Sequence, residues 1–159
     1  MFLKAGSIPK NSSKRDFKVK NMKYIKSAGF VVFKRYDNDN HYLIIKSRNG
    51  DLGFPKGHME RDESEIETAI RELKEETGVT AREVSGFKAY TEYPLPKNKN
   101  EMKSVIYFLG EYESGEVISQ ESEVLFARFM PYDEALSLLS FDATKDVLKQ
   151  AEIYLRSML

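Results

Sequence analysis

The sequence predicts one domain of mixed α/β architecture, with antiparallel strand pairs and a few helices. Runs of β-branched and aromatic residues fill two parts of the chain, a helix with both ends marked lies between them, and the segment from 131 to the end carries helical periodicity. A chain of 159 residues suffices for one sizeable core, and its composition, 41% hydrophobic and 31% charged, is that of a globular protein.

The predicted strands form two pairs and one single strand. The runs "SAGFVVFKRY" (27–36) and "HYLIIKSR" (41–48) flank "DNDN", which has turn chemistry, so they predict a β-hairpin. A second pair, at 86–93 and 103–112, flanks the polar, lysine-rich segment "PLPKNKNEM". The single strand is expected at 124–130.

The helix at 65–77 is marked at both ends. Ser64 and Glu67 have the spacing of a capping box, and Gly78 suits the position just past a helix C-terminus. Apolar residues recur within it at i, i+3, i+4 and i+7, which predicts one stripe that packs on the sheet. This stripe comprises Ile66, Ala69, Ile70 and Leu73.

Two further helices are expected after the last strand. The segment "PYDEALSLL" (131–139) opens with proline, which suits the first turn of a helix. The final segment, 142–159, has apolar residues at helical spacing. Its predicted buried face comprises Val147, Leu148, Ala151, Tyr154 and Leu155.

Residues 60–76 concentrate charge in a chain whose formal net charge is zero: eleven are charged, and eight of these are acidic. Carboxylates three and four residues apart on a helix repel one another. Glu72, Glu75 and Glu76 share one helical face, which makes an oxygen-rich site for a hard divalent cation such as Mg²⁺. The alternative is a solvated acidic face, stabilised by pairs such as Glu67 with Arg71.

Composition excludes several classes of protein. The chain has no cysteine, which excludes disulfides and thiolate metal sites and favours a cytoplasmic protein. No apolar run reaches the length of a membrane span, so we expect no membrane partner. Residues 1–26 hold eight Lys or Arg and one acid. We interpret 1–23 as a basic, partly flexible extension before a domain at 24–159, rather than as a nucleic-acid arm, because it lacks the aromatic interleaving that stacks bases.

The stretch "GHMERDESEIETAIRELKEETGV" (57–79) resembles the Nudix box in full. A pattern of this length is far more specific than a short motif. The resemblance implies a Nudix hydrolase, with a sandwich of mixed β-sheet flanked by helices. Such enzymes cleave a nucleoside diphosphate linked to another moiety with Mg²⁺, for which Mn²⁺ can substitute. The implied partner is therefore a small-molecule nucleotide substrate.

Residue-by-residue matching to the box implies a role for each matched side chain. The resemblance makes Glu72, Glu75 and Glu76 metal ligands. Arg71 would orient these carboxylates, and Glu63 is a further candidate for the metal shell. Gly57 and Gly78 would serve the loop geometry.

Weaker signals indicate the substrate. The stretches "PKGH" (55–58), "GFK" (86–88) and "KSVIYFL" (103–109) look like the asymmetric diadenosine tetraphosphate hydrolases within this family. Lys56 and His58 stand before the helix, where donor groups can meet phosphate oxygens. Lys103, with Lys97 and Lys99 of the polar loop, would hold the rest of the phosphate chain, although loop lysines are also ordinary surface residues.

Three more residues are assigned by this likeness. Tyr93 and Phe141 are candidates for stacking on adenine, and a place in the core is the alternative for each. Glu123 matches a glutamate outside the box that would act as metal ligand or general base. An exposed strand-edge glutamate is the alternative, and Glu121 competes for the role.

Other functions stay open at the level of the sequence. The loop from Tyr93 to Lys103 is longer than expected for animal-type members, and Pro94 stands near a proline of ADP-ribose-cleaving relatives. ADP-ribose or another nucleoside diphosphate derivative is therefore the first alternative substrate, followed by diphosphoinositol phosphates and capped RNA. A non-catalytic nucleotide-sensing domain is the alternative of another class, and the presence of all three box glutamates argues against it.

Overall fold

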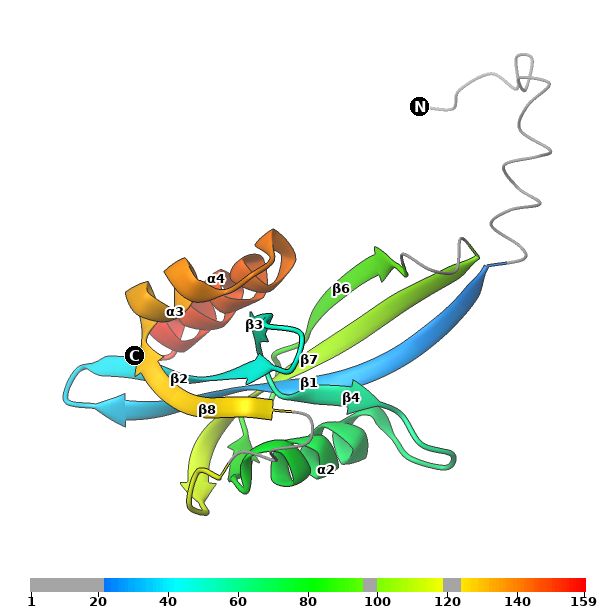
Figure 1. The fold of residues 1–159 in the computed structure, drawn as a ribbon. Helices are drawn as coiled ribbons and strands as arrows, with labels where there is room; N and C mark the ends of the chain where they lie inside the picture. Colours follow the sequence, from blue (N-terminus) through cyan, green and yellow to red (C-terminus); the bar gives the residue numbers. More distant parts are fainter. Residues whose placement is uncertain (1–21, 96–99, 119–123) are drawn as a thin grey trace, which may run out of the picture.

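A single mixed sheet forms the middle of the molecule (Figure 1). The computed structural model describes residues 22–95, 100–118 and 124–159. The strands are β1 (Lys23–Tyr36), β2 (Asp39–Ser47), β3 (Leu52–Gly53), β4 (Lys56–His58), β5 (Thr80–Glu83), β6 (Ala89–Pro94), β7 (Glu101–Ser114) and β8 (Val124–Pro131). The helices are α2 (Glu65–Thr77), α3 (Tyr132–Leu138) and α4 (Asp142–Ser157). This confirms the predicted mixed sheet flanked by helices.

Both predicted strand pairs are present. The turn after Tyr36 joins β1 and β2 as an antiparallel hairpin, with Asp37 in the left-handed region at φ 54°. Strands β6 and β7 also pair antiparallel, and β8 adds to β2. The order along the sheet is β3-β2-β1-β7-β5, with β4 on β1, β6 on β7 and β8 on β2.

The long central strands β1 and β7 pair in parallel, from Lys23 opposite Glu101 to Phe33 opposite Glu111. The strand pattern indicated only antiparallel pairs, and this parallel pair agrees with the mixed sheet that the Nudix resemblance implied. Strands β3, β4 and β5 were not predicted either, because segments of two to four residues are too short to show periodicity.

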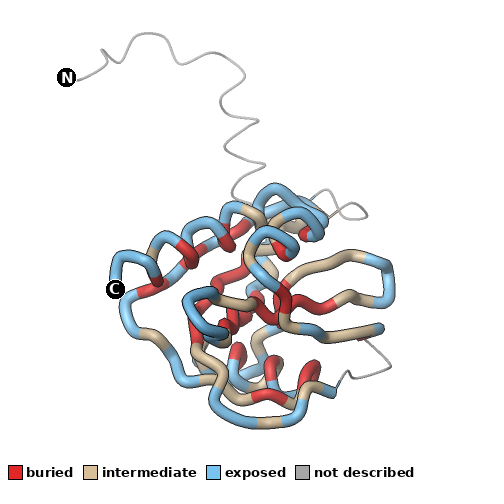
Figure 2. The backbone as a smooth tube through the Cα atoms, turned by 90° about the vertical axis from the view of Figure 1, so that its left-hand side faces the viewer, coloured by how far each residue is buried: buried red, intermediate tan, exposed pale blue. Residues whose placement is uncertain are grey.

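Side chains that alternate along the strands build two cores. Val31 and Phe33 of β1 belong to the larger core, beneath α3 and α4. Ala28, Phe30 and Val32 belong to the smaller core, beneath α2. This follows from the period of two in a strand. Figure 2 shows the buried stretches of the helices turned toward the sheet.

Helix α2 has the predicted bounds. The Ser64 side chain accepts a hydrogen bond from the backbone N–H of Glu67, and Gly78 closes the helix at φ 77°. Ala69 and Leu73 are buried as predicted, but Ile70 is 50% exposed, so its place in the buried stripe was wrong. The buried side of the helix instead includes Thr68 and Glu76.

The C-terminal helices match their predicted segments. The predicted face of α4 is buried at Val147, Leu148, Ala151 and Leu155, and Tyr154 packs against the same core. The Tyr154 hydroxyl donates to the carbonyl of Ser85 at 2.7 Å, which ties α4 to the segment before β6. Within the three described ranges, no helix has the length and apolar character that a bilayer crossing requires. The basic extension lies almost wholly outside these ranges, so its separation from the domain stays a prediction.

Candidate active site

Strand β4 lies at the point where the Nudix-box-like stretch meets the sheet. The N–H of Phe30 donates to the carbonyl of Pro55 at 3.1 Å, directly before β4. At Gly29, an added Cβ would collide with that carbonyl and lie 2.7 Å from the Cβ of Lys56. Glycine therefore allows the close approach that places Lys56. The sequence prediction missed this role of Gly29, although a glycine inside an otherwise bulky strand was a signal for it.

The carboxylate of Glu72 lies close to the Cα of Gly57. A Cβ at Gly57 would overlap the three terminal atoms of the Glu72 side chain. Glu76 meets the same strand, because one of its carboxylate oxygens accepts the backbone N–H of Lys56 at 3.2 Å. Two glutamates of α2 are thus fixed against two consecutive residues of β4.

Arg71 holds the acidic loop and helix together. Its Nε and Nη2 donate to the two carboxylate oxygens of Glu63, at 2.7 and 2.9 Å. Its Nη1 donates to Glu72 at 2.9 Å and to Glu75 at 3.2 Å. Nη2 also donates to the carbonyl of His58 at 3.0 Å, which connects the helix to the end of β4. Arg71 therefore contacts three carboxylates, as an orienting role would require.

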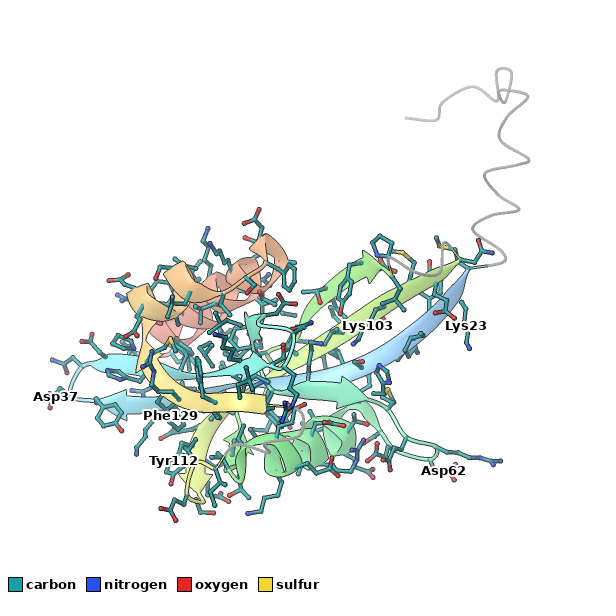
Figure 3. All side chains as sticks on the ribbon, in the orientation of Figure 1. Lys23, Asp37, Asp62, Lys103, Tyr112 and Phe129 are labelled. Atoms are coloured by element: carbon teal, nitrogen blue, oxygen red, sulfur yellow. The ribbon has the colours of Figure 1, made fainter. Side chains whose placement is uncertain are left out.

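Glu63 anchors the loop from β4 to α2, whose tip carries Asp62 (Figure 3). Hydrogen bonds from Arg71, and next from the backbone N–H of Glu60, lower the pKa of Glu63 to about 2. The hydroxyl of Thr68 also donates to Glu63 at 2.9 Å. Both oxygens of Glu63 are thus engaged with Arg71, and its part in the metal shell stays a prediction. The alternative pair of Glu67 with Arg71 does not form. The carboxylate of Glu67 accepts a hydrogen bond from the Ser64 hydroxyl instead.

The three box glutamates differ in exposure. The Glu72 side chain is 12% exposed, that of Glu75 is 50% exposed, and Glu76 is buried. Across the described ranges, no three acidic or histidine side chains are arranged as a group that could hold an ion. The donor set nevertheless fits a hard cation, because carboxylate oxygens are the ligands that Mg²⁺ prefers. Glu123 and Glu121 lie outside the described residues, as do Lys97 and Lys99.

A basic group lies beside these carboxylates. We define it as Lys56 and His58 of β4 with Lys103 of β7. Burial, and next the charge of Lys103, lower the pKa of Lys56 to about 8. Burial of part of the ring, then the charges of Lys103 and Lys56, also lower the pKa of His58. The three side chains are therefore close enough to affect one another. Figure 3 shows where Lys103 stands on β7, near β6.

The two aromatic candidates lie on different elements. Tyr93 of β6 stands opposite Lys103 in the register and is 38% exposed, so its ring is next to the basic group and open to solvent. Phe141 precedes α4 and is 53% exposed, which rules out the core alternative for it. The neighbouring Ser140 is fixed to β3 by two hydrogen bonds with the backbone of Leu52. No described contact joins Phe141 to Tyr93.

Carboxylates suited to a divalent cation, fixed next to cationic groups suited to phosphate oxygens, define a hydrolase of phosphate chains. The chain belongs to the NUDIX family: the model of the NUDIX domain matches residues 26–153. It is a Nudix hydrolase, and the chemistry of its family is the hydrolysis of pyrophosphate linkages with divalent metal cations.

Known relatives agree with this assignment along most of the chain. The bis(5'-nucleosyl)-tetraphosphatase (asymmetrical) of Rattus norvegicus is 31% identical over 147 residues, which cover 84% of this chain and 97% of the relative. The protein of that name from Sus scrofa is 32% identical over 148 residues. The crystal structure of a Caenorhabditis elegans Ap4A hydrolase binary complex is similar with a TM-score of 0.76 and 22% identity, covering 84% of this chain and 98% of that chain.

Proposed function

We propose that this Nudix hydrolase cleaves diadenosine tetraphosphate asymmetrically, to ATP and AMP, with Mg²⁺. The similarity to the rat and pig enzymes over 84% of the chain supports this substrate, because their names state the asymmetric reaction. The observation that carries the proposal is the junction at β4. There the carboxylates of Glu72 and Glu76 meet the strand that also bears Lys56 and His58.

Glu72, Glu75 and Glu76 are the residues that would hold the cation, with Glu123 as a fourth candidate. A bound divalent cation neutralises phosphate charge and acidifies water, and Mn²⁺ can take the place of Mg²⁺. Arg71 keeps Glu72 and Glu75 in position, and Glu63 in turn keeps Arg71 in position. In our proposal, these contacts keep the carboxylates on the helix face, and side-chain rotations would bring them together around the cation.

Lys56 and Lys103 are assigned to phosphate oxygens away from the cleaved bond. With a pKa of about 8, Lys56 is mostly protonated at neutral pH, and an anion beside it would favour this charged form further. The lowered pKa of His58 leaves its ring mostly neutral near pH 7, so that it can donate or accept a hydrogen bond. A departing ATP would be stabilised by these lysines as its negative charge develops.

A substrate panel tests this proposal. Purified protein with Mg²⁺ is offered diadenosine tetraphosphate, ADP-ribose, a diphosphoinositol phosphate and a capped RNA, and the products are separated by ion-exchange chromatography. We expect the highest kcat/KM on the dinucleotide, with equal amounts of ATP and AMP. Brisk hydrolysis of ADP-ribose beside an inert dinucleotide would move the enzyme to the first alternative. No hydrolysis of any nucleotide would support a sensing domain.

Replacement of Tyr93 tests the stacking role. Tyr93→Ala is expected to weaken dinucleotide binding by about 1–3 kcal/mol, whereas Tyr93→Phe changes it little, because the ring face makes the contact. Tyr90 is the matched control: it is exposed on the same strand, but it stands opposite Ile106, three residues from Lys103, and so points to the other face. KM and direct binding measure the effect. Equal losses in the Ala and Phe variants would assign the role to the hydroxyl instead.

A further inference from the structure

The hydroxyl of Ser27 stands out among buried polar atoms. Ser27 is 1% exposed, and in the part of the chain that the structure describes its Oγ is the buried side-chain nitrogen or oxygen without a hydrogen-bond partner. A buried hydroxyl without a partner destabilises the folded state, so such groups are rare in folded proteins. An alanine would fill this position without that cost. The hydroxyl therefore calls for a partner that the described residues do not supply.

The strand register places Ser27 on the face of the sheet that bears the basic group. Ser27 stands opposite His58 of β4 on one side and Val105 of β7 on the other. Directly opposed residues point to the same face. Val105 belongs to the larger core, as does Val31, four residues further along β1. Ser27 thus points away from α2, to the side of His58.

The two lysines of the basic group begin on either side of Ser27. Lys56 is opposite Gly29, and Lys103 is opposite Ile25. The register therefore places both lysines on the face of the sheet that bears Ser27, and the charge of Lys103 also contributes to the lowered pKa of Lys56. Two ammonium groups on one face attract an anion, and lysine side chains are flexible enough to turn toward it.

We propose that the Ser27 hydroxyl is a substrate-binding group that donates a hydrogen bond to a phosphate oxygen held between Lys56 and Lys103. This assignment rests on the proposed function, because it places a substrate phosphate at the basic group. The bond forms only when the ligand is bound, which explains why a folded protein keeps an unpartnered hydroxyl at this position. Ser27 therefore contributes to affinity for the phosphate chain and not to stability.

The test separates binding from stability. Ser27→Ala is expected to weaken binding of inorganic tripolyphosphate in Mg²⁺ buffer about tenfold, as measured by calorimetry, since a hydrogen bond to a charged group is lost. The unfolding temperature should stay the same or rise, because an unpartnered hydroxyl has been removed. Ser27→Cys keeps a side chain of similar size but with only a weak donor, so its affinity for tripolyphosphate should fall by a similar factor. If the alanine variant is less stable, the cysteine variant provides the test.

Ser104 supplies the matched control. It lies on β7 next to Val105, opposite Lys26, and therefore points to the other face of the sheet. Ser104→Ala should bind tripolyphosphate like the unchanged protein. Unaltered binding in both Ser27 variants would overturn the assignment. If Ser27 governs tripolyphosphate binding while diadenosine tetraphosphate is not hydrolysed, the proposed substrate fails and the phosphate contact stands.

Discussion

Replacing Glu76 by Gln is expected to lower turnover by at least about a hundredfold while the protein stays folded. The Glu76 carboxylate is buried and accepts the N–H of Lys56. Glutamine keeps an oxygen at that place, so the contact with β4 is preserved. The negative charge that would hold the cation is lost, and with it the stabilisation of the phosphate chain.

The measurement is kcat on diadenosine tetraphosphate across a Mg²⁺ titration, together with thermal unfolding. Glu83→Gln is the control, because Glu83 is exposed on β5 and the substitution replaces the same atoms as Glu76→Gln does. The control should keep full turnover. A Glu76→Gln protein with unchanged turnover would remove the metal assignment, whereas a raised Mg²⁺ requirement at low turnover would support it.

Replacing Gly57 by Ala is expected to lower kcat/KM by about a hundredfold, because misplacing a reacting group by about 1 Å can cost that much. The added Cβ would occupy the place of the Glu72 carboxylate. That carboxylate is also bound by Arg71, so it cannot move without disturbing the pairs with Glu63 and Glu75. Loss of activity should therefore accompany a folded protein whose metal affinity is reduced.

Gly53 offers the matched control for this substitution. An added Cβ at Gly53 has no atom within 4 Å, and its φ lies outside the left-handed region. Gly53→Ala should therefore retain its activity. Steady-state kinetics and Mg²⁺ affinity of both variants check the expectation. If Gly57→Ala were as active as Gly53→Ala, the contact between Glu72 and Gly57 would have no role in catalysis.

Local signals were sufficient for α2 and for the first hairpin. The capping box at Ser64 and the glycine at 78 fix both ends of the helix through contacts within a few residues. The turn at Asp37 is equally local. The parallel pairing of β1 with β7 joins segments far apart in the sequence, and no local pattern in either strand specifies it.

The error at Ile70 has a physical reason in the site. Apolar periodicity alone centred the buried stripe between Ile66 and Leu73. In the structure the helix is turned so that Glu72 and Glu76 meet β4, which buries a glutamate and leaves Ile70 exposed. A hydrophobic pattern cannot predict this orientation of α2, because it depends on contacts between charged residues and β4. That strand has only three residues.

The site was predictable from the sequence to different degrees. Arg71 meets the box carboxylates as the resemblance implied. Gly29, and Ser27 with its proposed role, were missed, because both stand opposite β4 in a register that only the folded sheet reveals. Glu123 lies outside the described residues, so its part in the site stays a prediction.

Hydrolysis of diadenosine tetraphosphate in ¹⁸O-labelled water is the most direct measurement of the central claim. If the carboxylates of α2 fix the cation near one adenosine and the lysines hold the remaining phosphates, water attacks the phosphorus next to that adenosine and ATP departs. Mass analysis should then find equal amounts of ATP and AMP, with the label in AMP. Label in ATP would contradict the direction of attack, and two molecules of ADP would contradict asymmetric cleavage itself.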